Sequence, residues 1–269
     1  MIQNARLIFQ SGPGDIGESL FRKTNVKLLL VNGNRTQAVT DTVLAEARLA
    51  AAPGTELAAV TASFGMDIVF SHAGDAIATH AVLDSLAHHY AGFDAAILAI
   101  SFDSGLAAAR ELLPIPVLGI TGSALNAACA LGQRIGIITF GAVSRRLYEE
   151  VFARTGVMPR VAGIRTIDIA SAGEYLAPAQ QDARIVAAAN ALATEDGADA
   201  VVICGAAMAG VSRRIGAAVK VPIVDGVACA VREAEALVRA GHRPAARLPG
   251  PSSRATGISV ELAALFARS

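Results

Sequence analysis

Asp94-Ala-Ala-Ile-Leu98 leads to Pro116-Val-Leu-Gly119, and the chain repeats this arrangement where Asp199-Ala-Val-Val-Ile203 leads to Pro222-Ile-Val-Asp225. The two copies are offset by about 105 residues. Each copy has a short aliphatic run, an Ala-rich stretch, a second aliphatic run that starts at Pro, and another Ala-rich stretch. Because both the order and the spacing of these elements agree, we predict a structural duplication with two similar lobes facing each other.

Further short aliphatic runs alternate with stretches of helical composition, at 26–32, 56–62 and 134–140. Strands that alternate with helices in this way predict α/β lobes, each with a parallel sheet covered on both faces. We place lobe 1 at residues 26–120 plus 226–269 and lobe 2 at 121–225. Residues 1–25 are left as an N-terminal extension.

The composition disfavours several kinds of partner. Lys+Arg and Asp+Glu are both 23, so there is no basic excess for a nucleic acid or an anionic membrane. The apolar runs are shorter than the roughly 18 residues of a spanning helix. Residues 1–25 mix charge with Pro and Gly, unlike a signal peptide. We therefore expect no nucleic-acid or membrane partner and a cytoplasmic location.

No motif indicates a metal or a cofactor. The three cysteines, Cys129, Cys204 and Cys229, have no C-x-x-C spacing, and the histidines show no H-E-x-x-H pattern. No phosphate-binding P-loop is present, and no G-x-G-x-x-G follows any of the strands predicted above. We predict free thiols, no metal and cofactor-free chemistry.

The ends of the predicted strands carry small and polar residues, where open α/β sheets bind their ligands. Gly and Ala let the main chain approach a small anion or imide closely, although the same residues also simply form turns. We predict that the substrate-binding residues are Asn32, Asn34, Asp103, Thr139, Gly205 and Ala206.

Two residues at comparable strand ends are candidate catalytic groups. Cys204 follows a buried run, where backbone N–H dipoles can lower the pKa of the thiol towards the thiolate; the alternative is an inert core cysteine. Ser101 can donate to an oxyanion but is a poor base. Cys129 and Cys229 lie in Ala-rich helical stretches, which indicates that their side chains pack against neighbouring residues and take no part in catalysis.

Several segments, taken together and in order, resemble the aspartate/glutamate racemase superfamily, in particular its hydantoin and allantoin racemases. The matching segments are Val31-Asn-Gly-Asn-Arg-Thr36 for I-N-P-N-T, Ser71-His72 with Asp75-Ala76 for S-H-Y-D-E-A, Cys204-Gly-Ala-Ala-Met-Ala-Gly210 for G-C-A-G-M-A-G, Asp225-Gly-Val for D-G-V, and Thr256-Gly-Ile-Ser for T-G-L-S. The resemblance implies two Rossmann-like lobes related by a pseudo-two-fold axis, an active site in the cleft between them, and a homo-oligomer. It also implies a small-molecule substrate that is a carboxylate or a cyclic ureide.

The sequence departs from that family at its two catalytic cysteines, one from each lobe. The first-lobe signature C-F-G-D-P-G-L appears as Ser101-Phe-Asp-Ser-Gly-Leu106, with Ser in place of Cys. In the second signature, aligning Met208 places Gly205 opposite the family cysteine, whereas aligning the cysteines selects Cys204. We select Cys204. A single second-lobe thiol also resembles arylmalonate decarboxylase.

Three functions remain open. The first is a racemase or epimerase that acts at a carbon alpha to a carbonyl, with Cys204 as acid/base. The second is a single-thiol lyase or hydrolase, and the third is a ligand-binding relic without turnover. The enzymatic hypotheses predict that Cys204 Sγ and Ser101 Oγ face a common cavity, with Asn32 or Asn34 and Thr139 on its walls.

Overall fold

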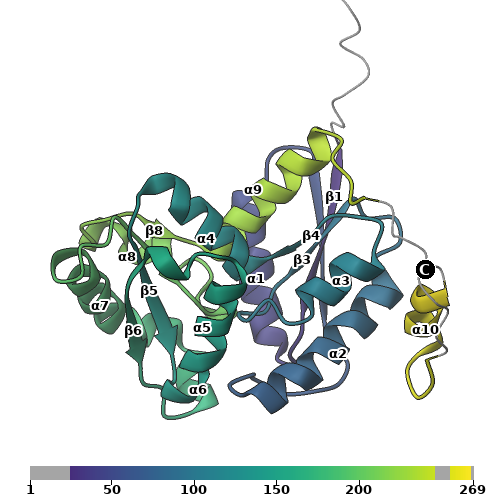
Figure 1. Cartoon of the computed structure of the whole chain (residues 1–269), viewed down its shortest axis with the longest axis horizontal. Helices are drawn as coiled ribbons and strands as arrows, with labels where there is room; N and C mark the ends of the chain where they lie inside the picture. Colours follow the sequence, from purple (N-terminus) through teal and green to yellow (C-terminus); the bar gives the residue numbers. More distant parts are fainter. Residues whose placement is uncertain (1–24, 246–254, 268–269) are drawn as a thin grey trace, which may run out of the picture.

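The computed structural model describes residues 25–245 and 255–267, so that 1–24 of the predicted N-terminal extension lie outside the described residues. Two four-stranded parallel sheets form the centres of two lobes (Figure 1). The first sheet has the order β2-β1-β3-β4, with β1 (Val26–Asn32), β2 (Thr55–Thr61), β3 (Ala95–Leu98) and β4 (Val117–Gly119). The second has the order β6-β5-β7-β8, with β5 (Ile135–Phe140), β6 (Val161–Ile167), β7 (Ala200–Ile203) and β8 (Ile223–Val224).

The two sheets have the same topology and matching registers. Leu28 pairs with Ala95 across β1 and β3, and Ile135 pairs with Ala200 across β5 and β7. The central strands β3, β5 and β7 are fully buried and β1 is buried except at Lys27, because helices cover both faces of a parallel sheet. The predicted α/β fold with two similar lobes is confirmed.

Helices fill the connections between the strands (Figure 1). They are α1 (Gln37–Ala50), α2 (His72–His89), α3 (Leu106–Leu112), α4 (Ile120–Leu131), α5 (Arg145–Arg154), α6 (Ala172–Tyr175), α7 (Asp182–Thr194), α8 (Val211–Ile215), α9 (Gly226–Arg239) and α10 (Val260–Ala267). None of the helices in the described ranges is long and apolar enough to cross a membrane.

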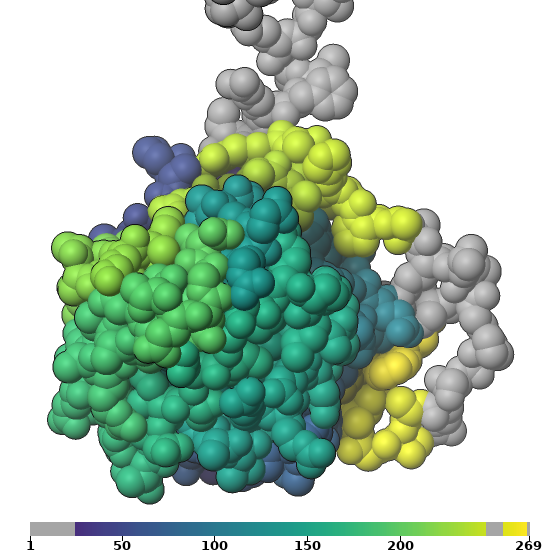
Figure 2. All heavy atoms as spheres, turned by 60° about the vertical axis from the view of Figure 1, so that its left-hand side comes forward, coloured from purple at the N-terminus to yellow at the C-terminus, as the bar shows by residue number. Residues whose placement is uncertain are grey.

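Helices α4 and α9 join the lobes. Helix α4 packs on β7 of the second sheet, whereas α9 returns to pack on β1, β3 and β4 of the first sheet. The two helices also pack on each other. Figure 2, turned so that the second lobe comes forward, shows α9 in yellow-green along the top of the molecule. The chain therefore passes between the lobes at two adjacent places.

Alternation along the strands sends side chains to opposite faces of each sheet. Ile138 and Phe140 belong to one buried hydrophobic cluster, whereas Ile137 and Val202 belong to the other. Cys204 lies in the same cluster as Val202, on the face covered by α4 and α5. The direction of this side chain is therefore fixed by the register of β7.

Candidate active site

At Ser101 a hydrogen bond joins the two lobes, between the loop that follows β3 and the loop that follows β7. The N–H of Ala206 donates to Ser101 Oγ at 2.8 Å, across a sequence separation of 105 residues. That separation equals the offset of the internal repeat, so equivalent positions of the two lobes are bonded to each other. Ser101 follows β3, and Ala206 begins the short 3-10 helix η4 (Ala206–Met208) after β7. The carboxyl ends of the two sheets thus face each other at this point.

Two tyrosine hydroxyls complete a polar cluster around Ser101. Tyr148 on α5 and Tyr175 on α6 both lie within hydrogen-bonding reach of the Ser101 side chain. Burial raises the pKa of Tyr148 well above its ordinary value and the pKa of Tyr175 to about 12, although the contact with Ser101 lowers both pKa values. Both hydroxyls therefore remain protonated and can donate to a ligand oxygen.

These tyrosines were not found in the sequence analysis, because no motif surrounds them. The one available signal is weak: the chain has 3 tyrosines in all, and two of them are in this cluster.

A small cavity between the lobes opens onto this cluster. Its volume is about 20 Å³, and its polar lining residues are Asn34, Ser101, Tyr175 and the main chain of Ala206. The other lining side chains are apolar: Val39, Ile68, Val69, Ile100 and Phe102. A cavity of this size holds about one water molecule, so the lobes are closed.

Cys204 is buried beneath this cavity and does not line it. Its side chain is 2% exposed, and its N–H donates to Ile138 O at 2.9 Å. In the first lobe the N–H of Ala99, a core residue, donates in the same way to Val31 O. Cys204 thus occupies a core position at the end of its strand, and the prediction that it faces a common cavity with Ser101 is wrong for this closed state.

The electrostatics at Cys204 also differ from the prediction. Burial is the main cause that raises the pKa of the thiol well above its ordinary value, and the charge of Asp103 raises the pKa further. Desolvation outweighs the strand-end dipoles because the sulfur has lost its contact with water. A negative charge on Cys204 would raise the pKa of both tyrosines, although burial is the larger cause.

Gly205 adopts a backbone conformation that side chains disfavour, with φ at 121°. A Cβ atom there would lie 2.9 Å from the hydroxyl of Tyr175. Gly205 is the position opposite the family cysteine when the motifs are aligned on Met208. In this structure the Tyr175 hydroxyl therefore fills the space into which a side chain at 205 would point.

The side chains of Asn32 and Asn34 differ in the hydrogen bonds that they form. Asn32 Nδ2 donates to Asn34 Oδ1 and to Thr40 Oγ1, both at 3.0 Å, so Asn32 shapes the loop that follows β1. Asn34 Oδ1 also accepts from the N–H of Thr36. Among the hydrogen bonds of the described residues none uses Asn34 Nδ2, which leaves this group as the donor that Asn34 can offer to a ligand in the cavity.

Asp103 caps a helix instead of facing the cavity between the lobes. Its carboxylate accepts from the N–H groups of Thr121 (3.0 Å) and Gly122 (2.8 Å) at the start of α4. A Cβ at Gly119 would lie 2.2 Å from Asp103 Cγ, so a glycine is required there. Both carboxylate oxygens accept hydrogen bonds from the main chain, and a part for Asp103 in substrate binding stays a prediction.

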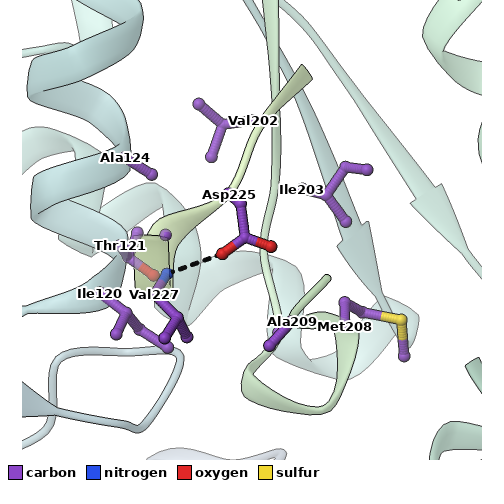
Figure 3. A pocket seen from close by; sticks show the side chains of 11 residues that line it. Ile120, Thr121, Ala124, Val202, Ile203, Met208, Ala209, Asp225 and Val227 are labelled. Atoms are coloured by element: carbon purple, nitrogen blue, oxygen red, sulfur yellow. Dashed lines mark hydrogen bonds between the residues drawn. The ribbon is translucent and has the colours of Figure 1, made fainter. Parts of the chain in front are cut away.

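Asp225 caps α9 in the equivalent way in the other half of the repeat. Its Oδ1 accepts from the N–H groups of Val227 and Ala228, as the dashed line in Figure 3 shows for Val227. The pocket drawn there lies at the junction of α4 and α9 and measures about 20 Å³, which is too small for a substrate.

Thr139 is also a structural residue in this state. Its Oγ1 shares a 2.9 Å hydrogen bond with Thr166 Oγ1 on the neighbouring strand, and the residue is 0% exposed. Thr139 is not among the residues that line the small cavity beside Ser101, and a part for it in substrate binding stays a prediction. No group of three or more His, Cys, Asp or Glu residues in the part of the chain that the structure describes could hold a metal ion.

Comparison with known proteins places these features in a family. Residues 28–234 match the sequence profile of the Asp/Glu/hydantoin racemase family. A hydantoin racemase from Rhizobium meliloti is 30% identical over 214 residues, which cover 79% of this chain and 89% of that protein. The crystal structure of an allantoin racemase from Pseudomonas fluorescens is 32% identical with a TM-score of 0.76, covering 82% of this chain and 94% of that one.

More distant structures share the fold alone. Unliganded arylmalonate decarboxylase is 17% identical with a TM-score of 0.51, covering 91% of this chain and 100% of that one. The match of the family profile spans both lobes and includes Ser101, Gly205 and Ala206. The chain therefore belongs to the Asp/Glu/hydantoin racemase family, and it is an isomerase of the racemase type.

Proposed function

We propose that this protein is a cofactor-independent racemase or epimerase that acts at a carbon alpha to a carbonyl in a small, hydantoin-like cyclic ureide. The observation that carries the proposal is the hydrogen bond between Ser101 Oγ and the Ala206 N–H, with the hydroxyls of Tyr148 and Tyr175 beside it. These groups are donors gathered at one point between the lobes. Such donors stabilise the negative charge that develops on a carbonyl oxygen when the adjacent C–H bond is broken.

The lining of the cavity supports a neutral substrate. No charged side chain of the described residues lines the small cavity that contains Ser101, so this cavity offers no partner for the ammonium and carboxylate groups of a free amino acid. A cyclic ureide instead presents neutral C=O and N–H groups to Ser101, Tyr175 and Asn34. An amino-acid-derived substrate fits best when its charged groups are masked, as they are in a hydantoin ring.

Opening of the lobes is a necessary step in this proposal. A cavity of about 20 Å³ cannot hold a five-membered ring, so the closed structure must separate at the contact between Ser101 and Ala206. Water then reaches the cluster, and the desolvation that raises the pKa of Cys204 is relieved. Hinge motions between lobes on the microsecond to millisecond scale are common in enzymes that close over a substrate.

We assign proton transfer to Cys204 because its ordinary pKa is the closest to neutrality among the cluster's hydroxyl and thiol groups. Once hydrated, the thiol can lose its proton to water. The thiolate then abstracts the proton from the alpha carbon, and water admitted by the opening returns a proton to the opposite face. Ser101, across the cleft, holds the oxyanion and is the other catalytic candidate, while Asn34, Gly205 and Ala206 bind the ring. The homo-oligomeric state, the cytoplasmic location and the absence of a cofactor stay predictions.

A second function, a single-thiol lyase or hydrolase, is favoured by one specific observation. Racemisation needs a proton donor on the face opposite to the base, yet Cys204 is the only thiol that the described residues contribute to this cluster. Cys129 on α4 and Cys229 on α9 are elsewhere, and burial raises the pKa of Cys229 to about 11. In this alternative Cys204 protonates an enediolate after loss of CO2, or attacks a carbonyl. The third possibility, a ligand-binding relic, predicts binding without conversion.

The experiment incubates the protein in D2O with hydantoins, allantoin, amino acids and substituted malonates, following deuteration, chirality and mass together. Racemisation with deuterium at the alpha carbon supports the racemase. Ring opening or loss of CO2 contradicts it and supports the second function. If Cys204→Ala keeps full activity, the assignment of Cys204 is wrong.

A further inference from the structure

A second cavity lies beside the site just described and is far larger. Its volume is about 410 Å³, compared with about 20 Å³ between Ser101 and Ala206, and the two cavities have no lining residue in common. One wall comes from α2, α3 and the loop before α3, and the other comes from α5 of the second lobe. Figure 1 shows α5 on the side of its lobe that faces α2 and α3. The volume is within the range of small-molecule sites.

Two arginines from different lobes line this cavity. Arg110 of α3 donates from Nε to Val117 O at 2.8 Å, and Arg154 of α5 donates from Nη2 to Phe102 O at 3.3 Å. In the described ranges neither arginine forms an ion pair with an Asp or Glu, although most other arginine contacts of the structure are ion pairs. Each guanidinium is therefore held in place by a main-chain carbonyl. The charges of both arginines also act on Asp103, which lines the same cavity, and the guanidinium N–H groups that are not bonded to a carbonyl face an anion in the cavity.

The remaining polar lining defines the chemistry of the ligand further. Asp75 accepts a 2.5 Å hydrogen bond from Ser104 Oγ, and its carboxylate lines the cavity together with Thr79 and Thr155. A carboxylate in this place disfavours a simple polyanion and favours a ligand that also has an N–H donor. We propose that the cavity between α2, α3 and α5 is a second ligand site for a small carboxylate with an amide or ureido N–H, bound by Arg110 and Arg154.

The same turn of the chain forms a wall of both cavities. Ser101 lines the space between the lobes, and Asp103, Ser104 and Gly105 line the second cavity. Thr121 ties the two ends of this turn together, since its N–H donates to Asp103 Oδ1 and its Oγ1 donates to Ser101 O at 2.5 Å. A ligand that bridges Arg110 and Arg154 therefore joins the lobes and holds the turn that positions Ser101.

The test is isothermal titration of the full chain with N-carbamoylglycine, a small carboxylate with a ureido group. Saturable binding is expected, with an affinity at least about tenfold weaker in Arg110→Gln/Arg154→Gln, because charge-assisted hydrogen bonds are lost. The control is Arg146→Gln, which removes one positive charge from α5 at an exposed residue outside the cavity lining and should bind as the unaltered protein does.

Two further variants separate this site from the cleft and from a folding defect. Ala107→Phe fills the cavity at an exposed position of α3 and leaves both arginines in the chain, and it should also weaken binding. Tyr175→Phe alters the cavity at Ser101 and should not weaken binding of N-carbamoylglycine. No saturable binding by the unaltered protein, equal binding by the double arginine variant, or loss of binding in Tyr175→Phe alone would overturn the proposal. None of these outcomes depends on whether the protein is a racemase.

Discussion

Replacing Ser101 by Ala tests the cluster that joins the two lobes. The substitution removes the acceptor of the Ala206 N–H, whose residue is 3% exposed, and the partner within reach of two buried tyrosine hydroxyls. A buried N–H left without a partner costs about 1–3 kcal/mol, and the lost contacts of the hydroxyls add to this. We expect the free energy of unfolding to fall by about 2–3 kcal/mol.

The matched control is Ser85→Ala. Ser85 has the same exposure of 8% as Ser101, but its Oγ donates only to Ala81 O within α2. Alanine is also the better helix former, so the expected change is about 0.5 kcal/mol or less. Urea unfolding followed by circular dichroism measures both variants. Equal losses of stability for the two serines would refute the reasoning that Ser101 organises buried donors.

Three further predictions concern the groups around this cluster. Burial raises the pKa of Asp103 from 3.8 to about 7, so the folded protein binds a proton that the unfolded chain has lost; stability should fall as pH rises from about 4 to 7, and urea unfolding of Asp103→Asn should lack this fall. Gly205→Ala should destabilise the protein by about 1–3 kcal/mol, because φ is 121° and the new Cβ meets the Tyr175 hydroxyl; thermal unfolding at or above the unaltered midpoint would contradict this. In the closed state, iodoacetamide should modify the half-buried Cys129 faster than the buried Cys204, as peptide mass mapping would detect.

The fold was predictable because the repeat is local in sequence. Asp94 and Asp199 each precede a buried strand, and each N–H donates to the carbonyl of the adjacent strand, Lys27 O or Arg134 O, at 2.8 Å. Such strand–helix units can be predicted from the sequence itself, because each has an aliphatic run, a Pro at the start of its second strand and Ala-rich stretches. Two copies with the same spacing therefore predicted two lobes with the same strand order.

The chemical surroundings of single residues depended instead on contacts between distant segments. Cys204 follows a strand as predicted, but the pKa of its thiol depends on burial by helices contributed from elsewhere in the chain. Asp103 caps a helix that begins 17 residues later, whereas Asp225 caps the helix that follows it directly. A capping residue next to its helix is visible in a sequence, and one across a loop and a strand is not.

The place of Ser101 was predicted correctly, but its partners were not. Tyr148 and Tyr175 come from α5 and α6 of the second lobe, and no spacing links them to Ser101. Their contribution became visible only when the lobes were seen closed against each other. Similarly, Gly205 could be aligned with the family cysteine, but the Tyr175 hydroxyl that fills its side-chain space could not be foreseen.

The most direct test of the central claim is deuterium exchange at the alpha carbon of one enantiomer of a 5-substituted hydantoin in D2O, measured by NMR and chiral chromatography. We expect deuteration and racemisation above the rate without protein, with the ring intact, and loss of both in Cys204→Ala. Ring opening without alpha deuteration, or unchanged exchange in Cys204→Ala, would contradict it.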